Sequence, residues 1–123
     1  MTANIKRGRM SIGIDLIDIS RMAVKMKRNK DFIHTFLCKN EADSLKALNF
    51  NESVEYAARV FAIKEAVLKA LKIGIGNGLE LWEIEVLKNC RAVKIDKKPF
   101  DKKQFAICTC KENNLLIATA IIY

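Results

Sequence analysis

The stretch YAARVFAIKEAVLKALKIGIGNG, residues 56–78, decides the fold. Apolar residues occupy most positions up to residue 71, which predicts a long helix covered on most sides rather than an amphipathic surface helix. At 100° per residue, Glu65, Lys69 and Lys72 fall within one narrow sector of this helix. A carboxylate among apolar neighbours needs a cation, a metal ion or hydrogen bonds. Two interpretations follow: an i,i+4 ion pair between Glu65 and Lys69 at the edge of the core, or a ligand site.

Length and composition predict one globular domain. Half of the 123 residues are hydrophobic, and neither an internal repeat nor a low-complexity segment is visible. The longest apolar runs have the length of strands and no signal-peptide pattern is present, so we expect a soluble, cytoplasmic protein that does not bind membranes. The four cysteines are expected to be reduced, because a domain of this size does not need disulfides. Residues 1–9 read as an extension before a second methionine, and residues 10–123 as the domain.

The charge balance favours an anionic partner or substrate. Lys and Arg number 22 against 14 Asp and Glu, which gives a formal net charge of +8. Nucleic acid, a phosphate-rich cofactor and an acidic protein are all compatible with this excess. A basic nucleic-acid-binding module is therefore one alternative, but the chain lacks an aromatic-rich strand motif and an Arg-rich recognition helix.

A strand precedes the helices. Residues 11–19, SIGIDLIDI, predict it, with Gly13 and Asp15 on one face and Ile12, Ile14 and Leu16 on the other. A carboxylate in an otherwise apolar strand lies at an exposed edge or faces a ligand. Gly13 would leave room for such a ligand to approach.

A basic helix is expected after this strand. Asp18 or Ser20 would cap it, and it would run to about residue 29. Its exposed surface carries four cations: Arg21, Lys25, Lys27 and Arg28. Most such surfaces are simply solvated. Residues 31–48 predict a short helical turn and a further helix that begins near Asn40.

The chain after the central helix predicts a sheet. KIGIGNG, residues 72–78, would end the helix and let the backbone approach a ligand, but it lacks the following helix of a dinucleotide-binding motif or P-loop. Four strands are expected, at residues 82–87, 91–95, 104–110 and 115–123. The predicted fold class is α+β, with a long central helix packed on a mainly antiparallel sheet.

Three blocks of the sequence resemble holo-[acyl-carrier-protein] synthase, the small 4'-phosphopantetheinyl transferase family. They are GIDLIDISR at residues 13–21, FAIKEAVLKALKIGIGNG at residues 61–78 and WEIEV at residues 82–86. FLCKNE at residues 36–41 is similar to a fourth, shorter block, and order and spacing agree over residues 10–123. The resemblance implies transfer of 4'-phosphopantetheine from coenzyme A to a serine of apo acyl carrier protein, with release of adenosine 3',5'-bisphosphate, for fatty acid biosynthesis.

The resemblance also implies roles for the two carboxylates. Asp15 and Glu65 match the family's pair of metal-binding positions, which hold Mg²⁺ against the pyrophosphate of coenzyme A. Few protein oxygens, completed by waters and phosphate oxygens, suit Mg²⁺. Glu65 would also be the base for the serine proton, directly or through a water. Lys69 would neutralise phosphate or steady Glu65, and Lys64 would do the same from the next sector of the helix.

Further contacts are implied in the same way. The glycine turn, with Gly74, Gly76 and Asn77, would lie along the coenzyme A site. The basic helix would steer the acidic acyl carrier protein through Arg21, Lys25 and Arg28. The family is typically a homotrimer with active sites between subunits, which would let Asp15 share a metal with Glu65 of the partner subunit.

Two positions depart from the family's pattern. Val60 stands where the family usually has Arg, and Arg59 is one residue earlier, about 100° around the helix. Cys108, Thr109 and Cys110 replace an ending similar to Ser-x-His, so the histidine is missing. These changes would weaken or retune coenzyme A binding. A non-catalytic homologue that binds acyl carrier protein is therefore a second alternative.

Overall fold

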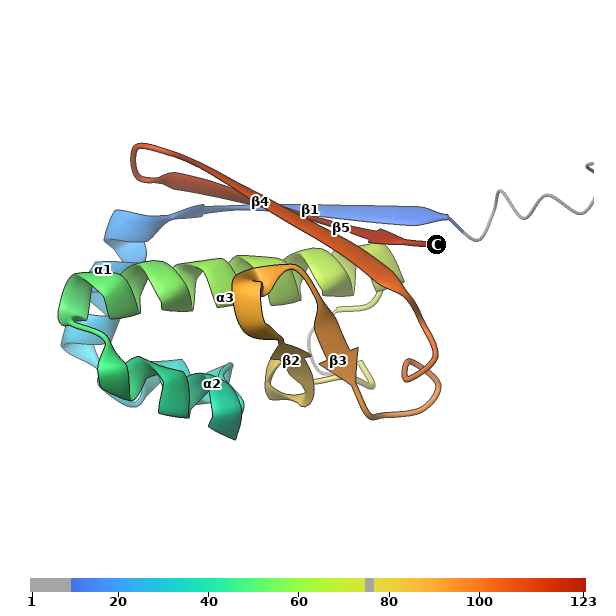
Figure 1. Ribbon diagram of the computed structural model, residues 1–123, viewed down its shortest axis with the longest axis horizontal. Helices are drawn as coiled ribbons and strands as arrows, with labels where there is room; N and C mark the ends of the chain where they lie inside the picture. Colours follow the sequence, from blue (N-terminus) through green and yellow to red (C-terminus); the bar gives the residue numbers. More distant parts are fainter. Residues whose placement is uncertain (1–9, 75–76) are drawn as a thin grey trace, which may run out of the picture.

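One long helix organises the fold in the computed structural model, which describes residues 10–74 and 77–123. This helix, α3 (Phe50–Leu71), lies along one face of a three-stranded sheet, and a two-stranded sheet packs against another side of it (Figure 1). Every strand pair is antiparallel. The predicted α+β class, with a long helix packed on an antiparallel sheet, is confirmed.

The larger sheet joins the two ends of the domain. Its order is β1-β5-β4, with β1 spanning Ser11–Asp18, β4 Phe105–Glu112 and β5 Leu115–Ile122. Asp15 lies opposite Ala118 in the register of β1 and β5. Asn113, which turns the β4–β5 hairpin, has a φ of 55°, a left-handed conformation that Asn adopts more readily than most residues. These three strands match the predicted ones, with small differences at their ends.

The central helix is longer than predicted. It begins after Asn49, whose side chain accepts a hydrogen bond from the backbone N–H of Glu52 at 2.8 Å, while Glu52 accepts one from the N–H of Asn49 at 3.0 Å. This reciprocal cap fixes the start six residues before the expected one. At the other end Lys72, not a glycine, adopts the left-handed C-cap conformation, with a φ of 61°.

Gly13 allows β1 and α3 to touch. A Cβ atom at this position would lie 2.0 Å from the carbonyl oxygen of Ala66 and 2.5 Å from the backbone nitrogen of Ala70. The expectation that Gly13 leaves room for a ligand is therefore wrong, because the helix backbone occupies that space. The opposite face of β1 carries Ile12, Ile14 and Leu16, and all three are more than half exposed.

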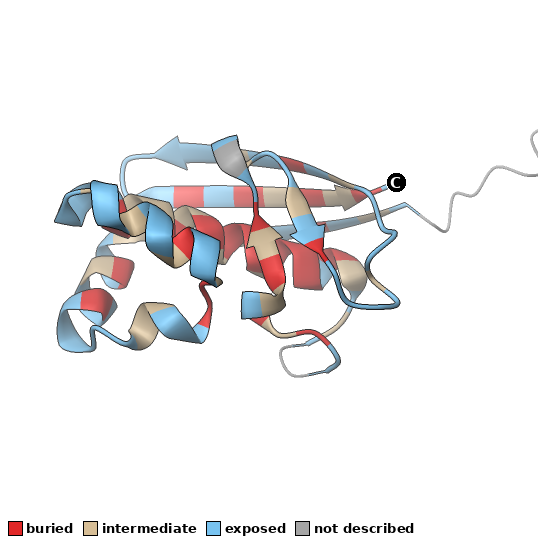
Figure 2. Ribbon diagram, turned by 60° about the horizontal axis from the view of Figure 1, so that its bottom comes forward, coloured by how far each residue is buried: buried red, intermediate tan, exposed pale blue. Residues whose placement is uncertain are grey.

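The short helices cover one end of α3. Helix α1 (Ile19–Arg28) begins at the predicted cap Asp18, whose carboxylate accepts from the N–H of Ser20, and it buries Met22 and Met26. Three further short elements follow: η3 (Phe32–Thr35), α2 (Lys39–Ser44) and η4 (Leu45–Ala47). Figure 2 shows that buried residues gather along α3 and along the strands that meet it. No helix within the described residues is long and apolar enough to cross a membrane.

The small sheet is shorter than predicted. Strand β2 spans only Ile84–Val86 and pairs with β3, Val93–Ile95; the turns η5 (Leu81–Glu83) and η6 (Lys88–Cys90) precede and follow β2. Trp82, expected in the strand, is 53% exposed in η5. The carboxylate of Glu83 accepts from the N–H of Glu80 at 2.8 Å, which holds this segment as a helical turn. All four cysteines are free thiols.

Candidate functional site

Asp15 and Lys69 form the centre of the candidate site. Strand β1 presents Asp15 on the face that meets α3, where its carboxylate is only 13% exposed. The Nζ atom of Lys69 lies 2.8 Å from Asp15 Oδ1 and also donates to the carbonyl oxygen of Ile14 at 3.2 Å. The close approach at Gly13 explains why a helix side chain reaches the strand so directly.

Glu65 lies one helical turn before Lys69. Burial raises the pKa of Glu65, the negative charge of Asp15 raises it further, and Lys69 partly opposes both effects. The charge of Asp15 therefore acts on Glu65 within one chain. Of the two interpretations of Glu65, the i,i+4 ion pair with Lys69 is not the one observed, because Lys69 pairs with Asp15.

The donor set fits a magnesium ion. Asp15 lies on β1 where this strand meets α3, and Glu65 lies on α3 one turn before Lys69, which pairs with Asp15. Within residues 10–74 and 77–123 there is no cluster of three or more His, Cys, Asp and Glu side chains able to hold a metal. Mg²⁺ is commonly bound by one or two carboxylates plus waters and substrate phosphates, whereas a structural zinc site needs about four protein ligands. Asp15 and Glu65 are the residues that would hold the ion.

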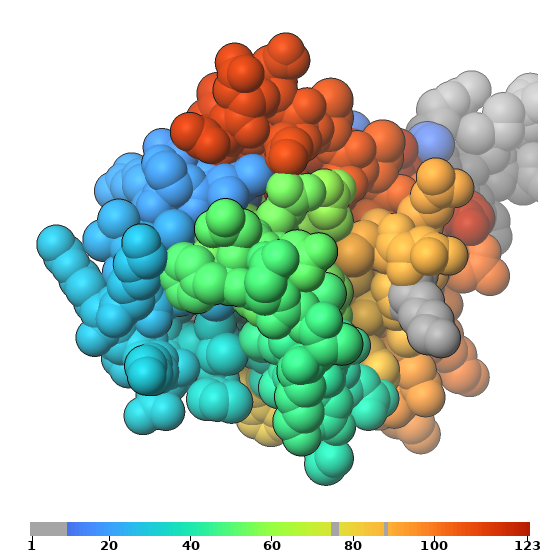
Figure 3. Space-filling model, turned by 60° about the vertical axis from the view of Figure 1, so that its left-hand side comes forward, coloured from blue at the N-terminus to red at the C-terminus, as the bar shows by residue number. Residues whose placement is uncertain are grey.

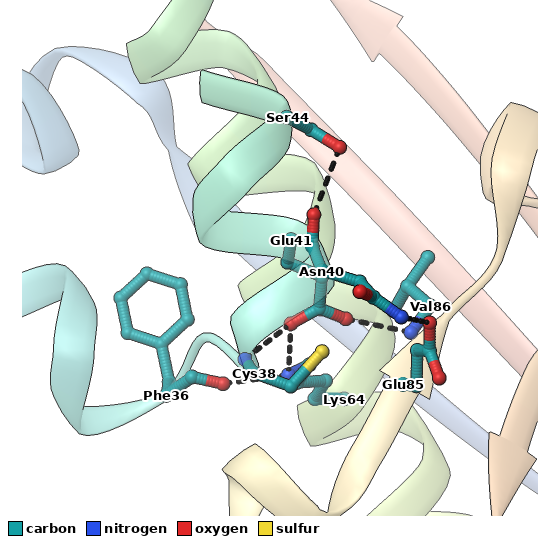
Figure 4. Close-up of polar contacts among 8 residues, drawn as sticks. All are labelled: Phe36, Cys38, Asn40, Glu41, Ser44, Lys64, Glu85 and Val86. Atoms are coloured by element: carbon teal, nitrogen blue, oxygen red, sulfur yellow. Dashed lines mark hydrogen bonds and ion pairs between the residues drawn. The ribbon is translucent and has the colours of Figure 1, made fainter. Parts of the chain in front are cut away.

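Lys64 belongs to a different network. Its side chain is 0% exposed, and its Nζ atom donates to the Glu41 carboxylate and to the carbonyl oxygen of Phe36, both at 2.6 Å (Figure 4). Burial lowers the pKa of Lys64, and the charge of Glu41 opposes that shift. The expected contact of Lys64 with coenzyme A does not fit this position, because the ammonium is enclosed by protein.

Glu41 completes this buried network. Its carboxylate also accepts from the backbone N–H groups of Cys38 at 2.9 Å and Val86 at 2.6 Å (Figure 4). The ion pair therefore ties α2 and β2 to the middle of the central helix. Sequence reasoning missed Glu41, although its place three residues after Cys38 is typical of a capping box.

The glycine turn is only partly described. The backbone N–H of Asn77 donates to the carbonyl oxygen of Gly74 at 3.1 Å, while Gly76 lies outside the described residues. Beside the end of α3 opens a cavity of about 880 Å³, whose lining includes three lysines: Lys72, Lys102 and Lys103. Lys72, three residues after Lys69 on the same stretch of chain, is thus part of the lining of this lysine-rich cavity.

The basic helix borders the candidate site. Arg21 and Lys25 line a groove of about 230 Å³, together with Leu16 and Asp18 of the strand that carries Asp15. Arg28 is exposed in the last turn of α1 and does not line this groove. In Figure 3 this part of the chain, blue to cyan, projects along one side of the molecule.

The two departures from the family's pattern lie elsewhere. Val60 is 0% exposed in the core. Arg59 donates to the hydroxyl of Thr109 on β4 and lies 3.3 Å from the Glu55 carboxylate. Cys110 is exposed on β4. Arg59 therefore links α3 to β4 of the larger sheet.

Comparison with known proteins supports a common ancestry over nearly the whole domain. The family model for the 4'-phosphopantetheinyl transferase superfamily matches residues 11–120. A holo-[acyl-carrier-protein] synthase of Campylobacter hominis is 36% identical over 105 residues, which cover 85% of this chain and 79% of that relative. One of Oceanobacillus iheyensis is 41% identical over 78 residues, 63% of this chain and 65% of that relative, a little under two thirds of its length.

Solved structures show the same fold. A holo-(acyl-carrier-protein) synthase of Bacillus anthracis, in complex with CoA (3',5'-ADP), superposes with a TM-score of 0.78 at 25% identity, covering 91% of this chain and 94% of that one. The Helicobacter pylori enzyme in complex with coenzyme A gives a TM-score of 0.74 at 28% identity, with 91% and 99% covered. The resemblance in the sequence is thus confirmed, and the chain belongs to the 4'-phosphopantetheinyl transferase superfamily.

Proposed function

We propose that this protein is a holo-[acyl-carrier-protein] synthase, which transfers 4'-phosphopantetheine from coenzyme A to a serine of apo acyl carrier protein in the cytoplasm, for fatty acid biosynthesis. One observation carries the proposal: the ammonium of Lys69 on α3 lies 2.8 Å from the carboxylate of Asp15 on β1, so Asp15 stands beside the helix that carries Glu65 one turn earlier. Two carboxylates able to bind a metal, next to a cation, suit phosphoryl transfer from a pyrophosphate. The family membership supports the same reaction.

The side chains of the site divide the chemistry between them. Mg²⁺, when bound by Asp15 and Glu65, supplies charge neutralisation at the pyrophosphate. Glu65 takes the serine proton, directly or through a water. The hydroxyl oxygen attacks the phosphorus that bears pantetheine, and the bond from that phosphorus to the bridging oxygen of the pyrophosphate breaks, which releases adenosine 3',5'-bisphosphate. The ammonium of Lys69 stabilises charge on the phosphoryl oxygens.

The substrates have matching surfaces nearby. The cavity at the end of α3, with Lys72, Lys102 and Lys103 in its lining, provides cations for the phosphates of coenzyme A. The turn of Gly74 and Asn77 follows directly on the helix that carries Glu65 and Lys69. Acyl carrier protein is acidic, and the exposed cations of α1 are placed to steer it toward Asp15. Those contacts are Arg21, Lys25 and Arg28.

A homotrimer is part of the proposal. We define the outer sheet face as the exposed apolar side chains on the side of the sheet away from α3: Ile12, Ile14, Leu16, Leu115 and Ile117. A contiguous apolar surface of this kind is typical of a protein–protein interface. Copies of the same chain, related by three-fold symmetry, are the expected cover.

Intact mass spectrometry tests the reaction. Apo acyl carrier protein is incubated with this protein and coenzyme A, with Mg²⁺ or with a chelator. We expect the carrier to gain the mass of one phosphopantetheine only when the metal is present. Glu65→Gln should slow this transfer on the order of 100-fold or more, because it removes both a metal ligand and the base.

The controls separate the alternatives. Lys39→Met, a change in an exposed ion pair of α2, should transfer at the wild-type rate. Full activity of Glu65→Gln would refute the assigned role of Glu65. No mass gain with a carrier that another transferase modifies would favour the non-catalytic homologue, and a carrier pull-down would then identify that activity.

A further inference from the structure

We propose that Lys69 is the resident counter-ion of the metal site: it holds Asp15 when no metal is bound, competes with the incoming divalent cation, and moves to a substrate phosphate when metal and coenzyme A bind together. The competition concerns this chain's own residues, whereas the last step rests on the proposed function. The inference explains why the ammonium contacts Asp15 and not its helical neighbour Glu65.

The geometry sets the two cations in competition for one carboxylate oxygen. Lys69 Nζ lies 2.8 Å from Asp15 Oδ1. Mg²⁺ binds carboxylate oxygen at about 2.0–2.1 Å, so an ion on that oxygen would be at most roughly 5 Å from the ammonium. The low exposure of the Asp15 side chain, 13%, strengthens the repulsion between the two cations, whereas the 54% exposure of Lys69 weakens it. Binding of a metal at Asp15 Oδ1 therefore favours departure of the ammonium.

The side chain of Lys69 can leave Asp15 without disturbing the core. Its side chain is 54% exposed, and its two acceptors, Asp15 Oδ1 and the carbonyl oxygen of Ile14, lie on the strand and not on its own helix. The flexible stem can swing outward without opening the core. Lys64 shows the contrast, because its ammonium is 0% exposed and held by the carboxylate of Glu41 and the carbonyl oxygen of Phe36.

A phosphate is the natural acceptor for the released ammonium. The pyrophosphate of coenzyme A would lie against a metal held by Asp15 and Glu65. Glu65 is within one helical turn of Lys69. Metal and coenzyme A then bind cooperatively: the metal displaces the ammonium, and the phosphate gives it a new partner. A fixed structural ion pair would produce no such coupling.

Binding of Mn²⁺ alone tests the competition. The free ion is measured by electron paramagnetic resonance for the wild-type protein, Lys69→Met and Lys30→Met. Lys30 is the control for net charge, because it is exposed and forms no ion pair with the described part of the chain. Lys69→Met should bind Mn²⁺ about three- to fivefold more tightly, the gain expected from removing a partly exposed ion pair. Lys30→Met should change the affinity less than about twofold.

Lys69→Met should have the opposite effect on the affinity for coenzyme A. With Mn²⁺ present, Lys69→Met should bind coenzyme A about tenfold more weakly than the wild type, because one charge-assisted contact to phosphate is lost. Lys69→Arg should keep most of that affinity. Asp15→Asn should lose Mn²⁺ binding in the absence of coenzyme A, which shows that the probe reports on this site.

Several outcomes would overturn the inference. Unchanged or weaker Mn²⁺ binding by Lys69→Met excludes competition, and so does a failure of all variants to bind Mn²⁺. Equal tightening of Mn²⁺ binding in Lys30→Met reduces the effect to net charge. If competition appears but no carrier protein is ever modified, the counter-ion role stands and the proposed function fails.

Discussion

The charged form of Glu65, which the proposed reaction uses, lowers the stability of the fold. Its carboxylate is partly buried and faces the negative charge of Asp15, and both effects raise its pKa. The folded state therefore binds the proton of Glu65 more tightly than the unfolded state does, and folding loses free energy as that proton is released. Folding therefore disfavours the carboxylate form of Glu65, the form that the proposed transfer reaction needs.

Glu65→Gln should consequently be at least as stable as the wild type at neutral pH while losing transfer activity. As the pH rises from the ordinary glutamate pKa of 4.5 through the raised pKa of Glu65, the stability of the wild type falls relative to that of the variant. Thermal unfolding at several pH values measures the difference, which should grow over that window and then stay constant.

Glu55→Gln is the control of opposite sign. Lys111 and Arg59 lower the pKa of Glu55, so its charge stabilises the fold above its ordinary pKa, and that contribution is lost as the pH falls through its lowered folded pKa. Its variant should be less stable than the wild type at neutral pH and nearly equal to it in acid. A neutral-pH loss of stability in Glu65→Gln would contradict the assignment for Glu65.

At this scale the sequence indicates which residues are unusual but not which of them meet. Asp15 and Glu65 could be identified because each is a carboxylate in an apolar segment, a pattern visible without a structure. The partner of Lys69 could not, because helical periodicity compares only residues of the same helix. The strand that supplies Asp15 is brought there by Gly13, whose role depends on a contact distant in sequence.

The central helix is held to its neighbours by a buried ion pair between Lys64 and Glu41, which the sequence of the helix alone does not reveal. Lys64 and Glu41 are both at most 1% exposed, and Glu41 also binds backbone N–H groups of Cys38 and Val86. A buried pair of this kind contributes little over an apolar pair, but removal of one partner leaves an uncompensated charge in the core. Its evident effect is to fix α2 and β2 relative to α3.

Lys64→Met should destabilise the domain by about 3–5 kcal/mol, a large part of the total stability of a small protein. Chemical denaturation followed by circular dichroism measures the loss. The matched control is Lys39→Met, whose ion pair with Asp43 is exposed and should change stability by less than about 1 kcal/mol.

A double variant identifies the cause of the loss. Lys64→Met combined with Glu41→Gln should be more stable than Lys64→Met alone, because the unpaired charge is gone while the amide oxygen still accepts one of the two backbone hydrogen bonds of Glu41. If the double variant is less stable than Lys64→Met, the loss comes from packing and not from charge.

Element boundaries were the least predictable part of the fold. The start of α3 is set by the reciprocal cap of Asn49 and Glu52, a signal that the apolar pattern of residues 56–71 hides. The alternation from Trp82 onward predicts a strand, but the capping role of Glu83 turns its first half into a helical turn. In both places a side-chain hydrogen bond to the backbone overrides hydrophobic periodicity.

The molecule as a whole leaves one apolar surface uncovered. The outer sheet face contains residues of β1 and β5 that alternate with buried ones along each strand. The sequence predicts the strands and their alternation but not which face of β1 meets the helix, because both faces carry apolar residues. Helix α3 covers the face with Gly13, which leaves Ile12, Ile14 and Leu16 outside.

Ile14→Glu should leave the fold of the chain intact and dissociate the proposed trimer into monomers. Ile14 is 53% exposed in the single chain, so a charge there costs little until a second copy covers it. Sedimentation velocity measures the assembly, and circular dichroism checks the fold. Val24→Glu, at a position 47% exposed on α1, is the control and should not change the mass. A monomeric wild type would refute the proposed assembly.

The pairing of β1 with β5 also determines when the strand that carries Asp15 can be placed during synthesis of the chain. Strand β5 lies between β1 and β4, so neither outer strand has a partner in the sheet until residues 115–122 have left the ribosome. Asp15 is translated early but takes its place opposite Ala118 only at that late stage. The site proposed for the metal and coenzyme A is therefore expected to form only after residues 115–122 are free to pair with β1.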